Sequence, residues 1–177
     1  MKMPMAYEEQ IAEMLRELGI SSAYGPDRGL PLIREAEELV PVERDIYGRP
    51  QQLAPAAAAA WLAMKVAADQ GGATLLLVSG FRSVDYQRGI WMRKLAAGEK
   101  AADILRVNAA PGYSEHHTGR AVDVTTPGCA PLAEELEKTV AFAWLVSRAA
   151  SFGFSMTYPR GNEHGMIYEP WHWLWRG

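Results

Sequence analysis

The order of apolar and polar positions along the chain predicts several helices and a few short strands. Residues 1–19 carry apolar side chains at helical spacing with glutamates between them, a pattern typical of an amphipathic helix. Gly19 is expected to end this helix. Residues 21–50 are rich in proline, glycine and charge, so we expect a loop with one or two short strands there.

The middle of the chain predicts three more helices and a buried strand. Residues 54–69 are mostly alanine, which has the strongest helix propensity, and two glycines follow them. Residues 83–97 and 101–107 resume helical spacing. The run 74–79 is apolar and bounded by glycines, as expected of a short buried strand.

The C-terminal third predicts one long helix between short strands. Residues 108–119 form a polar, glycine-containing loop, and residues 120–125 alternate as a strand does. Residues 132–151 are the longest helical stretch, and residues 152–177 predict two short strands joined by a loop at 159–165. The core positions expected on the long helix are Leu136, Val140, Phe142, Ala143 and Leu145.

Helices and strands are interspersed without a regular βαβ rhythm. We therefore expect an α+β fold with a small, mostly antiparallel sheet flanked by helices. A chain of 177 residues fits one domain, so residues 1–177 are expected to form a single unit. Within it, residues 1–50 hold the N-terminal helix and loop and show no motif that assigns them a role.

Composition narrows the class of partner. Hydrophobic residues make up 49% of the chain and charged residues 22%, which is typical of a globular protein. The formal charge is −3 and Lys and Arg do not cluster, which argues against a nucleic-acid or anionic-membrane partner. Cys129 is the only cysteine, so the chain predicts neither an internal disulfide nor a cysteine-based zinc cluster.

The sequence contains no run of about 18 apolar residues, so no integral membrane segment is expected. The acidic residues of the first helix also exclude a signal peptide within it. The expected compartment is periplasmic or extracellular if an export signal has been removed, and cytoplasmic otherwise. Nothing in the sequence indicates the oligomeric state.

Candidate chemistry lies in two segments on either side of the predicted long helix. In the first, a loop offers His116, Gly119 allows a sharp turn, and the following strand presents Asp123. In the second, Glu169 and His172 are three positions apart, so they would point to opposite faces of an ideal strand. They can share one site only if the backbone near the intervening proline is irregular.

Two imidazoles and one carboxylate are a ligand set that suits Zn²⁺, and three protein ligands leave the fourth position open for catalysis. Glu169, next to such a site, could act as general base for the attacking water. Arg82, at the end of the buried strand, is the candidate for stabilising an oxyanion.

The same residues also allow a structural interpretation. Each histidine alone could be a hydrogen-bonded core residue, Arg82 a surface ion-pair partner and Glu169 a solvated acid. The tryptophans of the C-terminal segment could pack in the core or form a substrate platform. Residue types and spacing alone leave a metallohydrolase and a structural protein both open.

Three separated motifs narrow this choice. They comprise residues 79–83 with Gln87, the pattern Ser114-x-His116-x-x-Gly119-x-Ala121-x-Asp123, and residues 168–173 with Glu169-x-x-His172. Together they resemble the zinc D-alanyl-D-alanine carboxypeptidases of the VanY type. These belong to a group that includes the D-Ala-D-Ala dipeptidases and the hedgehog N-terminal domain. The resemblance covers about residues 54–175.

The resemblance implies roles for individual residues. His116, Asp123 and His172 would be the zinc ligands, Glu169 the catalytic base and Arg82 the group that polarises the substrate carbonyl. Gln87 and Ser114 would line the substrate cleft. His117 and His164 match no ligand position, which leaves them roles at the surface or behind the ligands.

The implied reaction is hydrolysis of the peptide bond before a C-terminal D-alanine in peptidoglycan stem peptides. Within the same class, the alternatives are an L,D-carboxypeptidase and a D-Ala-D-Ala dipeptidase. From a different class comes an inactive zinc-holding binding module, although such a module needs neither Glu169 nor Arg82.

Overall fold

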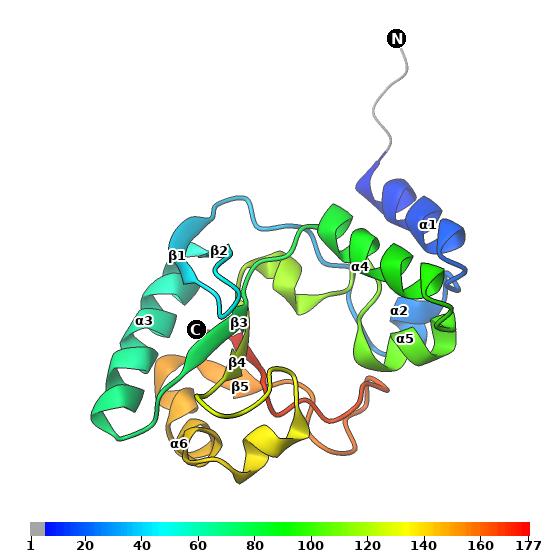
Figure 1. Ribbon diagram of the computed structural model, residues 1–177. Helices are drawn as coiled ribbons and strands as arrows, with labels where there is room; N and C mark the ends of the chain where they lie inside the picture. Colours follow the sequence, from blue (N-terminus) through cyan, green and yellow to red (C-terminus); the bar gives the residue numbers. More distant parts are fainter. Residues whose placement is uncertain (1–5) are drawn as a thin grey trace.

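The computed structural model describes residues 6–177, in which a four-stranded antiparallel sheet lies between two groups of helices (Figure 1). The strand order is β3-β4-β6-β5. The strands are β3 (Leu76–Ser79), β4 (Ala121–Thr125), β5 (Phe154–Met156) and β6 (His172–Trp175). This architecture confirms the predicted α+β fold with a small antiparallel sheet, and the two C-terminal strands pair as expected.

A separate hairpin lies beside the edge of this sheet. Its strands are β1 (Val40–Arg44) and β2 (Pro50–Leu53), and the N–H of Ile46 in its turn donates to the carbonyl of Leu77 in β3. The prediction of one or two short strands within residues 21–50 is confirmed by β1, whereas β2 begins only at Pro50. The sequence pattern did not reveal the four-residue helix α2 (Tyr24–Asp27) in the same region.

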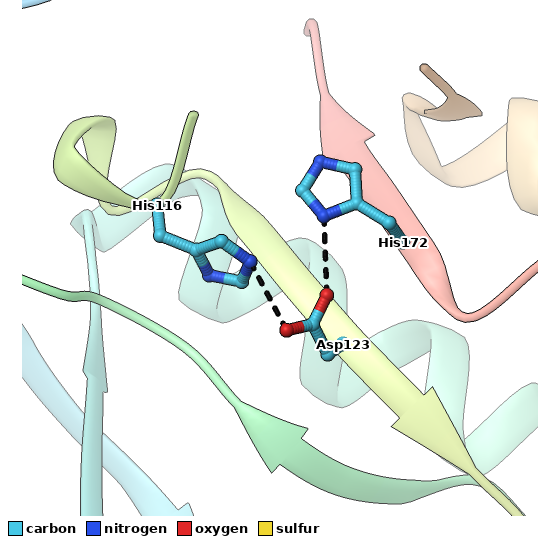
Figure 2. A group of neighbouring side chains, drawn as sticks. All are labelled: His116, Asp123 and His172. Carbon is cyan, nitrogen blue, oxygen red and sulfur yellow. Dashed lines mark hydrogen bonds and ion pairs between the residues drawn. The ribbon is translucent and has the colours of Figure 1, made fainter. Parts of the chain in front are cut away.

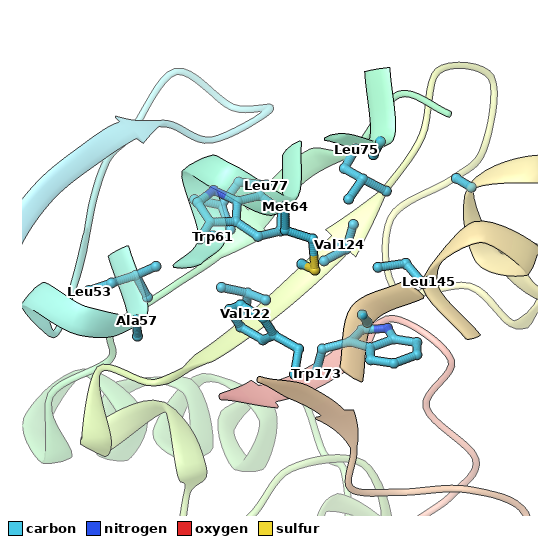
Figure 3. Packing of buried hydrophobic residues seen from close by; sticks show 14 of the residues in the cluster. Leu53, Ala57, Trp61, Met64, Leu75, Leu77, Val122, Val124, Leu145 and Trp173 are labelled. Atoms are coloured by element: carbon cyan, nitrogen blue, oxygen red, sulfur yellow. The ribbon is translucent and has the colours of Figure 1, made fainter. Parts of the chain in front are cut away.

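One face of the sheet packs on α3 (Pro55–Gln70) and α6 (Val140–Arg148). Helix α3 begins with a proline, which suits the first helical turn, and its alanines allow close packing. Alternation in β4 sends Val122 and Val124 into this core, where they meet Trp61 and Trp173 (Figure 3). The side chains between these valines must therefore point to the opposite face.

The second group of helices covers that opposite side (Figure 1). It comprises α1 (Tyr7–Glu17), α2, α4 (Val84–Ala96) and α5 (Ala101–Val107), which share a separate apolar cluster. Ser83 caps α4 by accepting a hydrogen bond from the N–H of Tyr86. The predicted helix 1–19 is confirmed over α1, whereas residues 1–5 lie outside the described residues.

The segment before β1 is tied to the rest of the chain by polar contacts. Glu35 accepts a hydrogen bond from the N–H of Val84 at the start of α4. The Arg28 guanidinium donates to the carbonyl of Leu105, and the Nδ1 atom of His164 lies 3.0 Å from the Arg28 carbonyl oxygen. The N-terminal residues thus contact both α4 and the loop that precedes β6.

The prediction of a single long helix over residues 132–151 is wrong. Leu132 has a positive φ of 54°, and a 3₁₀ helix (Glu134–Lys138) comes before α6. Thr139 has an extended backbone, and its hydroxyl accepts from the N–H of Phe142, so a new helix begins there. A second 3₁₀ helix (Ala149–Phe152) follows α6.

The break also changes the burial of the expected core positions. Leu136 and Leu145 are buried as predicted, and Phe142 is half-buried, but Val140 and Ala143 are exposed. Cys129 is half-buried. Within residues 6–177, no helix combines the length and the apolar character needed to cross a membrane.

Candidate metal and active site

Asp123 and His172 are direct partners in the pairing of β4 with β6. Cross-strand partners present their side chains on the same face of a sheet. Both side chains lie on the face opposite the α3 core, and Asp123 Oδ1 is 3.1 Å from His172 Nδ1 (Figure 2). Both residues are buried, with exposed fractions of 3% each.

His116 reaches the same point from the 3₁₀ helix Glu115–Thr118, which comes directly before β4 (Figure 2). Gly119 joins the two elements with a φ of 65°, and a Cβ at this position would lie 2.8 Å from the backbone nitrogen of Ala54. Only glycine therefore suits this turn, as the sequence predicted.

The hydrogen bonds of His116 determine which nitrogen faces Asp123. Its Nδ1 atom lies 2.6 Å from the carbonyl oxygen of Gly80, which can only accept, so Nδ1 carries the proton. The unprotonated Nε2 atom lies 3.2 Å from Asp123 Oδ2, yet it has no hydrogen-bond partner among residues 6–177. Two lone pairs therefore face each other in a buried position, an arrangement that a cation between them would stabilise.

Burial and neighbouring charges set the ionisation of the three side chains, and His172 would have to give up its Nδ1 proton to bind a metal. Burial and the nearby Arg82 charge lower the pKa of His116 to about 4, which keeps it neutral. Burial alone would raise the pKa of Asp123, but its interactions with His116, His172 and Arg82 hold it well below its usual value. Burial alone would lower the pKa of His172, but hydrogen bonds to Asp123 and Glu115 outweigh it and raise the pKa to about 10.

One nitrogen from each histidine and one oxygen of Asp123 lie within 4.8 Å of one another. Two imidazole nitrogens and a carboxylate oxygen at this spacing are donors that a tetrahedral divalent metal accepts, and Zn²⁺ prefers such a mixed set. The residues present therefore fit a metal of this kind.

Glu169 lies beside this cluster because the chain turns just before β6. The N–H of His172 donates to the Glu169 carbonyl at 3.2 Å, so residues 169–172 form a turn and not a regular strand. This confirms the irregular backbone that the sequence required at Pro170. Burial raises the pKa of the Glu169 side chain to about 7.

Arg82, Gln87 and Ser114 lie next to the same cluster. The Arg82 guanidinium donates to Asp123 Oδ2 at 3.1 Å and to Gln87 Oε1 at 3.3 Å. The Gln87 amide also donates to the carbonyl of Ala109 at 2.8 Å. Both ends of the Gln87 amide thus have protein partners, and this contact network orients Arg82.

A niche and a cleft adjoin the cluster. The niche has a volume of about 30 Å³, enough for a water molecule, and its lining includes His116, His172, Glu169, Arg82, Gln87 and Ser114. The cleft has a volume of about 510 Å³, and its lining includes Asp123, Glu169, Arg82, Trp171 and residues of α4. Each of the site residues predicted from the sequence therefore lines the niche, the cleft or both, and Arg82 and Glu169 line both.

Three contacts at or behind the cluster were not foreseen from the sequence. The carboxylate of Glu115 lies 2.8 Å from His172 Nε2, and the hydroxyl of Thr157 donates to the same oxygen at 2.8 Å. The ring of Tyr158 stacks on the His172 ring at a centroid distance of 4.9 Å. The position of Glu115 directly before His116 was the only sequence signal, and it gave no hint that its side chain contacts the other histidine.

The remaining histidines lie away from the ligand positions. His117 is fully buried, so the surface role allowed for it is wrong; its Nδ1 donates to the Arg82 carbonyl and its Nε2 accepts from the N–H of Gly112. His164 is half-buried in the loop before β6. Of the C-terminal tryptophans, Trp173 belongs to the core and Trp171 lines the cleft.

Comparison with known proteins matches this arrangement to one family. Residues 50–177 match the family model described as VanY, D-alanyl-D-alanine carboxypeptidase. The D-alanyl-D-alanine carboxypeptidase of Enterococcus faecalis is 30% identical over 121 residues, which are 63% of this chain and 43% of that protein. The chain thus spans less than half the length of this relative.

Two solved structures share the fold. The LD-carboxypeptidase LdcB is 33% identical with a TM-score of 0.73, over 83% of this chain and 72% of that one. A mutant of the vancomycin resistance D,D-pentapeptidase VanY, in complex with Zn(II), is 26% identical with a TM-score of 0.63, over 84% of this chain and 83% of that one. With the family match over residues 50–177, these comparisons show that the chain belongs to the VanY family of D-alanyl-D-alanine carboxypeptidases.

Proposed function

We propose that this protein is a zinc carboxypeptidase that hydrolyses the peptide bond before a C-terminal D-alanine in peptidoglycan stem peptides. The main observation in its favour is that one ligand atom each of His116, Asp123 and His172 lies within 4.8 Å of the other two. Glu169 lines both the niche and the cleft beside them. Family membership and the Zn(II) complex of the related VanY structure support the same assignment.

In this proposal His116 Nε2, His172 Nδ1 and one carboxylate oxygen of Asp123 would hold the zinc. Bound zinc would supply a positive charge that makes water a stronger nucleophile and polarises the scissile carbonyl. The Gly80 carbonyl keeps His116 in the tautomer that presents Nε2. Asp123 supplies the negative charge that a divalent cation requires in a buried position.

Glu169 acts as the proton carrier. Its carboxylate takes a proton from the attacking water as the water oxygen bonds to the scissile carbonyl carbon. It then returns the proton to the nitrogen of the departing D-alanine, so that the C–N bond breaks and D-alanine leaves with a neutral amine. Its place in a niche of water-molecule size favours this role. A water held there lies next to the ligand cluster and to the cleft that would contain the peptide.

Arg82 and Gln87 are assigned to binding the substrate. The Arg82 guanidinium carries a fixed positive charge at the cleft, where it can donate to the carbonyl oxygen as negative charge develops. Gln87 orients Arg82 through its amide oxygen, and Ser114 contributes to the wall of the niche. A cleft of about 510 Å³ has the volume of a small-peptide site.

A second candidate is an L,D-carboxypeptidase that acts on a tetrapeptide stem. The observation in its favour is the LdcB likeness, at 33% identity and a TM-score of 0.73. The metal cluster and Glu169 would serve either reaction, because the two substrates differ in the residue on the amino side of the scissile bond.

The test is incubation of the purified protein with a model pentapeptide, tetrapeptide and D-Ala-D-Ala dipeptide, followed by mass spectrometry. We expect D-alanine release from the pentapeptide that stops with a chelator and returns with zinc. Release from the tetrapeptide alone would favour the second candidate, and cleavage of the dipeptide alone would favour a dipeptidase. Zinc binding without cleavage of any of the three would favour an inactive binding module.

The N-terminal segment is included in the same proposed domain. The family match begins at residue 50, but α1 and α2 share an apolar cluster with α4 and α5. Arg28 bonds both to the end of α5 and to the loop that leads to Glu169. We infer that residues 6–50 brace the wall of the cleft.

A further inference from the structure

The Glu115 side chain connects two segments behind the ligand cluster. One of its oxygens, Oε2, lies 2.8 Å from His172 Nε2 and accepts a hydrogen bond from the Thr157 hydroxyl at 2.8 Å. The side chain is only 15% exposed. A partly buried carboxylate with two defined partners holds a fixed orientation, because leaving either partner unpaired would cost free energy.

The contact decides which His172 nitrogen can bind a cation. Each ring nitrogen of His172 faces a carboxylate oxygen, and an ionised carboxylate only accepts hydrogen bonds. When a cation between His172 and Asp123 takes the place of the Nδ1 proton, the remaining proton lies on Nε2, where Glu115 accepts it. The other nitrogen, Nδ1, then presents its lone pair 3.1 Å from Asp123 Oδ1. In metal sites the second ring nitrogen of a histidine ligand usually donates to a carboxylate or a backbone carbonyl, which sets the tautomer and the ring angle.

The two histidines receive this support from different groups. His116 donates from Nδ1 to a backbone carbonyl, that of Gly80, at 2.6 Å, and presents Nε2. His172 has the reverse arrangement: its Nδ1 faces Asp123, and the partner of its Nε2 is the side chain of Glu115. Glu115 contacts the ring nitrogen opposite the one that faces Asp123, so it lies on the outer side of the ring and is not placed as a ligand.

We propose that Glu115, held by Thr157, is a positioning residue that fixes His172 in the tautomer and orientation required for metal binding. This inference rests on the proposed function, since it takes His116, Asp123 and His172 as the metal ligands. Glu115 lines the niche, but its carboxylate contacts the His172 nitrogen that faces away from Asp123, so it acts through His172. Its removal should therefore weaken the site even when all three ligands are intact.

The test compares the affinity for zinc alone, measured by competition with a chromophoric chelator, among the wild type and four variants. Glu115→Ala is expected to weaken zinc binding by about 10- to 100-fold. Glu115→Gln should recover most of this loss, because the amide oxygen can accept the same hydrogen bond from Nε2. Thr157→Val should weaken binding by about 5-fold, the effect of one hydrogen bond. Glu135→Ala is the control, since Glu135 is an exposed acid outside the cluster.

Each outcome either supports or contradicts the positioning role of Glu115. Wild-type affinity in Glu115→Ala, or an equal loss in Glu115→Gln and Glu115→Ala, would overturn the positioning role while leaving the proposed function intact. A wild-type protein that binds no zinc would overturn the proposed function and this inference together. If Glu115→Ala does not fold, Thr157→Val decides: unchanged affinity contradicts the role, and the stated weakening supports it.

Discussion

Asp123 and His172 face each other across β4 and β6, with Oδ1 and Nδ1 separated by 3.1 Å. This cross-strand pair brings together the two sequence segments that carry the candidate chemistry. The strand alternation that buries Val122 and Val124 on one side of the sheet places Asp123 on the other. The geometry of the site is therefore a direct consequence of how the core packs.

The assigned role of Glu169 predicts a separation of metal binding from turnover. Glu169→Gln removes the proton acceptor but leaves the three ligands, so the variant should keep its zinc and lose about 10²- to 10⁴-fold in kcat. Zinc content by mass spectrometry and D-alanine release check both parts. The matched control is Glu163→Gln, an exposed glutamate in the same loop. Wild-type turnover in Glu169→Gln would defeat the assignment.

Asp45 is expected to stabilise the hairpin beside the cleft. Its buried carboxylate accepts hydrogen bonds from the N–H groups of Tyr47 and Arg49, from the Arg49 guanidinium and from Gln51. Asp45→Ala should lower the free energy of unfolding at pH 7 by about 1–3 kcal/mol. Little of this comes from the ion pair itself, because Arg49 is half-exposed. Urea denaturation measures the difference.

The same side chain predicts a pH dependence. Burial alone would raise the pKa of Asp45, but hydrogen bonds from Arg49 and Tyr47 outweigh it and lower the pKa below the usual 3.8. Its contribution is therefore complete above the unfolded pKa and disappears as the pH falls through the lower folded pKa. The stability difference between the wild type and Asp45→Ala should stay constant from about pH 7 to about pH 5 and shrink as the pH falls below about 4. A constant difference would refute this explanation.

Gly119 and Gly48 form a matched pair for testing the turn before β4. Both have positive φ, 65° and 78°, but only a Cβ at Gly119 would meet another atom, the Ala54 nitrogen at 2.8 Å. Gly48→Ala should cost about 1 kcal/mol for the backbone conformation alone. Gly119→Ala should cost at least about 1 kcal/mol more because of the clash, and should also weaken zinc binding. Equal losses of stability in the two variants would show that the close approach is unimportant.

The N-terminal segment should unfold together with the rest of the chain. Ile11 is 1% exposed in the cluster that α1 shares with α4, so Ile11→Ala should destabilise the protein by about 2–5 kcal/mol. Circular dichroism and tryptophan fluorescence should show one common transition. Glu13→Ala, on the exposed side of the same helix, should have little effect. Two separate transitions would mean that residues 6–50 form an independent unit.

The strands and the turns beside the candidate site could be predicted from the sequence because both depend on local patterns. Gly119 and the irregular backbone at Pro170 followed from conformational requirements that a single residue type reveals. The long helix over 132–151 failed because Thr139 caps a new helix and Leu132 adopts a positive φ, which helical periodicity does not report. The contact between Glu115 and His172 depends on how η1 (Glu115–Thr118) meets β6, and such a long-range relation leaves no pattern along the chain.

The most direct test of the central claim is an anomalous difference map, collected at the zinc absorption edge from crystals grown with zinc. The account predicts one strong peak about 2.0–2.2 Å from His116 Nε2, His172 Nδ1 and a carboxylate oxygen of Asp123. A map with no peak between these three side chains, or with zinc bound only elsewhere on the protein, would contradict it.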